Sequence, residues 1–302
     1  VDRTSLLPAE ESFTRNMPGS LPSRAADNLY WLGRYIERAE GTIRILRAWH
    51  ARYAEAADAR TPLLGNVTDY LESLDIEIDP AIPNSLITNI ESALYSASRI
   101  RDRFSPDGWL ALADLAKTAR DFNKKVKPGD DATRAATVLL RKLAGFAGLV
   151  HENMYRFTGW RFLTIGRMLE RGLHMTRLLG HMSGEDAPDG TYDMLLEIGD
   201  SVMTHRRRYN VATARVTVTD LLALDPLNPR SIFYQLNEIK TEVEHLPNAY
   251  VDGQMSPLYR EALRLHSTIA LMTADTMTPN VYKELEREME QLSDVLAQTY
   301  LH

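Results

Sequence analysis

Apolar residues recur every three or four positions along most of the chain, which is the period of an amphipathic α-helix. The first clear stripe follows Ser23, a plausible N-cap, and consists of Leu29, Leu32, Ile36, Ala39, Ile43 and Leu46. Similar runs between turn residues predict further helices over 84–104, 109–126, 130–157, 160–182, 191–210, 219–224 and 231–245. Two long helices are expected to begin near Pro257 and Pro279, because proline is tolerated in a first helical turn. Strand-like runs are nearly absent, so the pattern predicts an all-α, multi-helix bundle.

Residues 1–22 lack such a pattern and contain Pro8, Pro18, Gly19 and Pro22. We therefore expect a linker or tail there and a single helical domain over 23–302. A start at Val1 leaves open whether the chain is native or a piece of a longer protein.

A Gly-Arg-x-x-Glu-Arg motif occurs twice, at Gly33–Arg38 and at Gly166–Arg171, with an offset of 133 residues between the copies. The apolar stripe shifts by the same offset, so residues 28–46 and 161–179 form an internal repeat. The spacing is too long for a short solenoid repeat. We interpret it as duplication of a half-bundle, with pseudo-twofold symmetry.

The charged residues of the motif lie on the helix face opposite the apolar stripe, and most of their neighbours on that face are apolar. A helix that is apolar nearly all round is buried, and a buried arginine keeps its proton and needs a carboxylate partner. Glu37 and Glu170 are the expected partners, within one helix or between the copies. Two interpretations stay open: a buried ion-pair network, or an anion pocket formed by Arg34, Arg38, Arg167 and Arg171.

A second group of candidates surrounds a predicted helix start at Ser231. Asn228 is expected to cap this helix, with the Ser231 hydroxyl in its first turn; the alternative is an anion site at the helix N-terminus, assisted by Arg230. Arg206, Arg208 and Tyr209 are candidates for the same pocket.

The composition limits the chemistry. The net charge of −6 gives no basic excess for nucleic acid, no apolar run is long enough to span a bilayer, and the first twenty residues lack a signal core. The absence of cysteine excludes disulfides and fits a reducing compartment, so we expect a cytoplasmic protein without nucleic-acid or membrane partners. No phosphate-binding loop occurs, and only Glu242 and His245 have the Glu-x-x-His spacing that a di-iron bundle needs twice. We therefore expect no metal and no cofactor in this chain.

Several segments together resemble the bacterial alpha-E domain family, named for its α-helices and Glu-Arg motif. They are Ser23–Glu40, Arg101–Trp109, Glu152–Met154, Gly159–Arg171, Thr204–Tyr209 and Asp220–Ser231, with His205 in place of a tyrosine usual in the family. The likeness extends over nearly everything from Ser23 to the C-terminus.

The resemblance implies a setting for the chain. Members of this family are encoded beside, or fused behind, a circularly permuted ATP-grasp protein, and the association suggests peptide or amide-bond synthesis. It implies that this chain is a helical partner or fused domain of an amide ligase, and that ATP and Mg are bound only by the ligase. The helical domain would bind the ligase or a carboxylate-bearing peptide. Two alternatives remain: an enzyme that uses the paired glutamates as acid and base, and a purely structural bundle.

Overall fold

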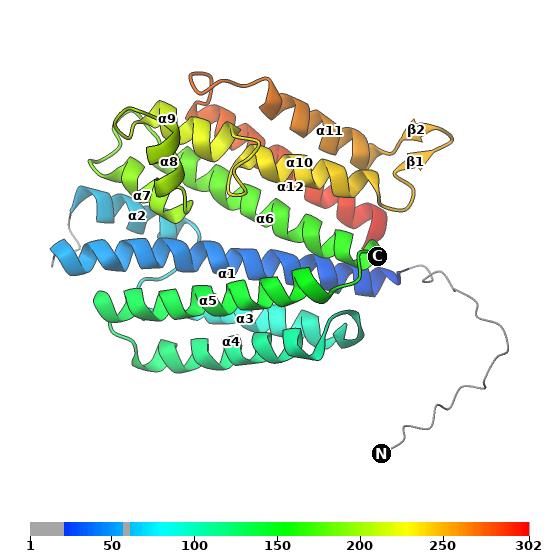
Figure 1. The fold of residues 1–302 in the computed structure, drawn as a ribbon, viewed down its shortest axis with the longest axis horizontal. Coiled ribbons are helices and arrows are strands. Elements are labelled where there is room, and N and C mark those ends of the chain that lie inside the picture. The colour runs from blue at the N-terminus through cyan, green and yellow to red at the C-terminus, as the bar shows by residue number, and fades with distance from the viewer. Residues whose placement is uncertain (1–20, 57–60, 302) are drawn as a thin grey trace, which may run out of the picture.

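Two long helices, α1 (Ser23–Ala56) and α6 (Thr158–Met182), pack against each other through the middle of the molecule (Figure 1). The computed structural model describes residues 21–56 and 61–301. The predicted tail at 1–22 therefore lies almost wholly outside the described residues. The apolar stripe predicted on α1 is buried, from Leu29 to Leu46, and on α6 Phe162, Ile165 and Leu169 are buried as well. The all-α fold class is confirmed.

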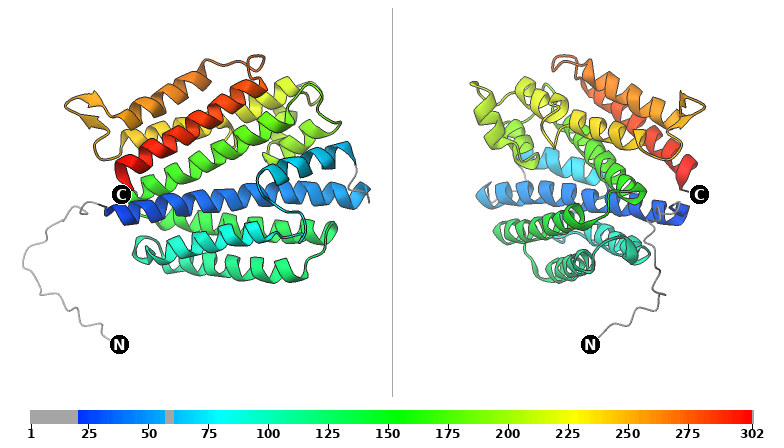
Figure 2. Two further views of the ribbon diagram at one scale, coloured as in Figure 1. Left: turned by 180° about the vertical axis from the view of Figure 1, so that it is seen from behind. Right: turned by 45° about the vertical axis from the view of Figure 1, so that its right-hand side comes forward.

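Each central helix carries three further long helices. The first set is α3 (Asn84–Ser98), α4 (Pro106–Lys125) and α5 (Asp130–Asn153); the second set is α10 (Ile232–Glu244), α11 (Pro257–Ala270) and α12 (Pro279–Tyr300). In both sets the first and third helices pack against the central helix, and the middle helix packs against those two. Figure 2 shows the two sets on opposite sides of the α1–α6 pair. This arrangement fits two equivalent halves, while their origin by duplication stays a prediction.

Shorter elements connect these helices. They are α2 (Pro62–Ser73), a 3-10 turn η1 (Arg101–Arg103), α7 (Thr191–Ile198), α8 (Val202–Arg208), α9 (Arg215–Thr219), a π-helical turn η2 (Asp220–Leu224), and a hairpin of β1 (Tyr250–Val251) and β2 (Gln254–Met255). Of these, α2 contacts both α1 and α6. None of the helices in the described ranges combines the length and the apolar character needed to cross a membrane.

The structure corrects several predicted element boundaries. The helix predicted over 191–210 is two helices, because Gly199 and Asp200, the latter with a φ of 50°, interrupt it. The predicted 84–104 helix ends at Ser98 and is followed by η1. A helix not expected from the sequence, α2, contains Gly65 and is capped by Thr61, which accepts a hydrogen bond from the Leu64 N–H. The predicted helix over 160–182 begins earlier, at Thr158, so Gly159 lies in the first turn of α6.

Two glycines allow the central helices to touch through their backbones. A Cβ placed on Gly33 would lie 2.4 Å from the Leu163 carbonyl oxygen, and one placed on Gly166 would lie 2.2 Å from the Tyr30 carbonyl oxygen. The contacts are reciprocal, since each pair follows from the other by the 133-residue offset of the motif. No side chain other than hydrogen fits at either position, which explains why both copies of the motif begin with glycine.

Replacing Gly166 with alanine should therefore destabilise the fold. The new methyl group would meet rigid backbone, so we expect a loss at or above the upper end of the about 1–3 kcal/mol that overpacking typically costs. Urea unfolding of Gly166→Ala measures this loss. Gly145→Ala is the matched control, because Gly145 lies on the exposed face of α5 with open space around it and the substitution should stabilise by about 0.5–1 kcal/mol. Equal stability of the two variants would contradict the close backbone contact.

Candidate functional site

The two copies of the Glu-Arg motif bind each other across the helix crossing. Glu37 of α1 accepts hydrogen bonds from Arg167 and Arg171 of α6, each with an Nε–carboxylate distance of 2.9 Å. Glu170 of α6 accepts from Arg34, and from Arg38 at 2.8 Å (Nε to Oε1). The partners are thus exchanged between the copies, and the geometry is that of an ion-pair network.

The network is buried, which sets its electrostatics. The Glu37 and Glu170 residues are 2% and 3% exposed, so each carboxylate depends on its arginines for the interactions that water would otherwise supply. Burial by itself would raise the pKa of Glu170, but Arg34 and Arg38 outweigh burial and lower that pKa to about 2. At neutral pH this carboxylate is ionised and has no proton to donate.

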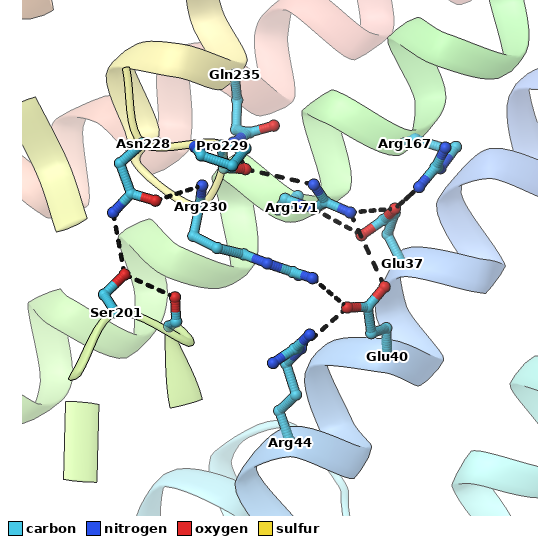
Figure 3. Close-up of polar contacts among 11 residues, drawn as sticks. Glu37, Glu40, Arg44, Arg167, Arg171, Ser201, Asn228, Pro229, Arg230 and Gln235 are labelled. Atoms are coloured by element: carbon cyan, nitrogen blue, oxygen red, sulfur yellow. Dashed lines mark hydrogen bonds and ion pairs between the residues drawn. The ribbon is translucent and has the colours of Figure 1, made fainter. Parts of the chain in front are cut away.

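A second cluster adjoins the Glu37 pair and contains Glu40, Arg44 and Arg230 (Figure 3). The Glu40 Oε1 atom accepts from Nη2 of Arg230 at 2.6 Å and from Nε of Arg44 at 2.9 Å. Burial acts to raise the pKa of Glu40, but Arg230, Arg171 and Arg44 hold it well below its usual range. Arg171 joins the clusters, because it binds Glu37 and its Nη2 atom lies 3.9 Å from Oε2 of Glu40. It also donates to the Pro229 carbonyl in the loop before α10.

The turn before α10 is organised mainly by its own side chains. Ser231, rather than Asn228 as predicted, is the N-cap of α10, since its hydroxyl oxygen accepts from the Tyr234 N–H while the hydroxyl donates to the Asp225 carbonyl. The Asn228 amide instead donates to Ser201 and to the Leu221 carbonyl. Of this turn, Arg230 is the residue whose side chain reaches the motif network.

The candidates from α8 lie apart from the motif network. Arg208 pairs with Asp225, and the Tyr209 hydroxyl donates to Asp220. Arg206 is exposed. Through Asp225, Arg208 is connected to the Ser231 turn, but within the described part of the chain neither it nor Tyr209 forms a hydrogen bond or ion pair with Glu37, Glu40 or Glu170.

A cavity of about 430 Å³ adjoins the Glu170 side of the crossing. Its walls come from α1, α2, the loop after α2, α6 and the first part of α3, and they include Arg38, Glu170, His174 and Arg177. His174 and Arg177 were not among the predicted site residues, although both lie on the motif helix. Tyr70 also lines the cavity, and it belongs to α2, the helix that the apolar pattern did not predict.

The residues that could hold a metal are otherwise engaged. Within 21–56 and 61–301, no three histidine, aspartate or glutamate side chains gather in a way that could bind an ion. Glu242, half of the Glu-x-x-His pair, binds Arg161 at 2.7 Å, and His245 is exposed at the end of α10.

Comparison with known proteins places this network in a family context. The profile of the Alpha-E family, described as "A predicted alpha-helical domain with a conserved ER motif", matches residues 21–301. The chain is 28% identical over 271 residues to the "Uncharacterized protein Rv2567" of Mycobacterium tuberculosis and equally to the "Uncharacterized protein Mb2597" of Mycobacterium bovis. Each alignment covers 75% of this chain but 30% of the relative, so the chain spans less than a third of those proteins. No solved structure matches the chain.

Glu170→Gln should destabilise the protein strongly. It leaves Arg34 and Arg38 without their carboxylate, and breaking one side of a buried pair costs about 3–5 kcal/mol. The free energy of unfolding in urea measures the loss. Glu91→Gln is the control, since Glu91 and Arg120 form an exposed pair that should contribute at most about 1 kcal/mol. Similar losses in both variants would rule out a buried, mutually dependent network.

The same carboxylate predicts a pH dependence of stability. Because the pKa of Glu170 falls from an ordinary 4.5 to about 2 on folding, its contribution is fully present above pH 4.5 and is lost as the pH falls toward 2. The unfolding free energy, measured from pH 6 to pH 2, should therefore drop less steeply in Glu170→Gln than in the wild type. Parallel curves for the two proteins would contradict this assignment.

Proposed function

The chain belongs to the Alpha-E family, and from that premise we propose that it is a non-catalytic helical domain that works with an ATP-grasp amide or peptide ligase, in trans or fused to it. In this proposal the ligase, a circularly permuted ATP-grasp protein, binds ATP and Mg in the cytoplasm. The chain binds the ligase or holds a carboxylate-bearing peptide for it.

The observation that carries this proposal is that both glutamates of the Glu-Arg network are paired with arginines. An acid–base enzyme needs a group whose pKa lies near the working pH. Glu170 is instead held ionised by two arginines, and both oxygens of Glu37 accept hydrogen bonds from arginine. A network of this kind fixes how the two halves are oriented and leaves binding, rather than proton transfer, as the function for the surrounding residues.

The arginines around the crossing favour a carboxylate as the group that is bound. On the Glu37 side, Arg44, Arg167, Arg171 and Arg230 surround Glu37 and Glu40 alone. The planar guanidinium group matches a carboxylate through paired hydrogen bonds. A peptide terminus or an acidic side chain would therefore find favourable electrostatics near this network.

The length of the relatives supports a fused or partnered arrangement. Their sequences extend well beyond the aligned part, so the domain works there within a much longer chain. The 302 residues of this chain contain no phosphate-binding loop, which agrees with ATP chemistry being located in a partner.

Binding to the ligase tests this proposal. Purified chain should not bind Mg·ATP alone in calorimetry, should form a complex with the ATP-grasp protein encoded with it, and should raise that protein's ATP-dependent amide formation. Absence of a complex and of any effect on amide formation would refute the proposal. Amide formation by the isolated chain would favour the enzyme alternative.

The structural alternative needs a variant that stays folded. Arg206→Glu and Arg207→Glu change exposed residues of α8 away from the network, and both should leave stability nearly unchanged. If the wild-type chain and these folded variants all leave the ligase reaction unchanged, the binding role is refuted and the bundle is structural only.

A further inference from the structure

The residues that line the cavity beside Glu170 include three with a buried polar atom that has no hydrogen-bond partner among the described residues, and one of these atoms is the Ser85 hydroxyl oxygen. The Tyr70 hydroxyl and the Nε2 atom of His174 have no hydrogen-bond partner among the described residues. Tyr70 is 2% exposed, and Nε2 of His174 is likewise shielded from solvent. Buried polar groups are almost always paired, so unpaired groups on several residues that line one cavity indicate that something else binds there.

Two arginines on the same wall also keep free donors. Arg38 uses Nε and Nη2 for Glu170, and Arg177 uses Nε and Nη2 for Glu286 and Glu290. The Nη1 group of each arginine therefore has no protein partner within the described ranges. Each Nη1 carries two N–H donors.

The protonation states make this wall rich in donors. Burial lowers the pKa of His174 to about 4 and raises the pKa of Tyr70, so both side chains are neutral at pH 7. Glu170 already accepts three hydrogen bonds from Arg34 and Arg38. Asp75 lies at the exposed rim and is the other carboxylate that lines the cavity.

The rest of the lining combines aliphatic residues with the polar residues Thr42, Ser85, Thr88 and Asn89, and the space is limited. Ile45, Leu74 and Ile76 contribute aliphatic surface, and the volume of about 430 Å³ falls at the small end of the range for ligand sites. A bare inorganic anion would leave this aliphatic surface unused. An anion with an attached aliphatic group would fill both parts of the cavity.

The equivalent position on the other side of the crossing has different surroundings. Shifting His174 by the 133-residue offset gives Gly41, and the His174 ring packs directly over that glycine. On the Glu37 side, Arg230 enters from the loop before α10 and binds Glu40. The motif is thus repeated, but its surroundings differ. Arg230 lies beside the copy on the Glu37 side, and the cavity lies beside the copy on the Glu170 side.

We propose that this cavity binds the free carboxylate of a small acylated amino acid or peptide C-terminus, with an aliphatic side chain against Ile45, Leu74 and Ile76. Arg38 and Arg177 hold the carboxylate through Nη1, and Tyr70 and His174 complete its hydrogen bonds. The choice of a peptide-like ligand rests on the proposed function; the site itself rests on the unpaired groups and the cavity.

Calorimetry on the isolated chain tests the site without the ligase. N-acetyl-L-leucine should bind, and N-acetyl-L-leucinamide, which lacks the carboxylate charge, should bind at least about tenfold more weakly, as expected for loss of one charge-assisted interaction. Equal binding of the two, or no binding of either, overturns the proposal. Inorganic phosphate binding as tightly as N-acetyl-L-leucine would show a general anion site and would overturn the aliphatic part.

Variants assign the binding to this cavity. Tyr70→Phe removes an unpaired hydroxyl, so the protein should stay as stable as the wild type while its affinity for N-acetyl-L-leucine falls roughly fivefold. Tyr300→Phe is the matched control, because the Tyr300 hydroxyl binds the Pro247 carbonyl elsewhere, and its affinity should be unchanged. Unchanged affinity in Tyr70→Phe, or a crystal structure with only water between Tyr70 and His174, refutes the site.

These outcomes separate the two proposals. Binding of N-acetyl-L-leucine by a chain that forms no complex with the ligase would preserve this site and refute the proposed function. A ligase complex formed by a chain that does not bind N-acetyl-L-leucine would refute this site and preserve the proposed function.

Discussion

Backbone contact between α1 and α6 is the constraint on which the rest of the structure depends. The glycines at 33 and 166 bring the helices so close that the carboxylates of Glu37 and Glu170 are buried between them. The arginines and glutamates of the motif must then satisfy one another, and each glutamate receives two arginines of the opposite helix. Desolvation offsets much of the attraction, so the network contributes more to the relative orientation of the halves than to net stability.

The two sides of this crossing share a motif but differ in what surrounds them. Arg230 closes the Glu37 side, and a donor-rich cavity adjoins the Glu170 side. The α1–α6 crossing is thus symmetric in its motif, but its surroundings are not. One copy of the motif contacts Arg230 through Glu40, and the other borders a cavity of ligand size. The proposed carboxylate site depends on this difference.

Much of the central architecture could be predicted from the sequence, because helix periodicity is a local signal. The buried stripe from Leu29 to Leu46 and the charged positions on the opposite face both follow from 3.6-residue spacing. Pairing between the copies was one of two open interpretations, since spacing within a helix does not specify contacts across 130 residues. The cavity was not predictable: α2, which supplies Tyr70, is short and begins with a capped proline turn, and His174 required knowledge of the space over Gly41.

The sequence separation of these ion pairs has a consequence for synthesis. The partners lie between 130 and 136 residues apart, so α1 leaves the ribosome long before α6 exists. At about 5–20 residues per second, this interval lasts roughly 7 to 27 seconds. During that time α3, α4 and α5 can pack against one face of α1. The face that later contacts α6, with Gly33, Arg34 and Glu37, stays exposed to solvent. The nascent first half therefore exposes the surface that its own second half will bind. A chaperone or a second nascent chain has access to that surface during this interval.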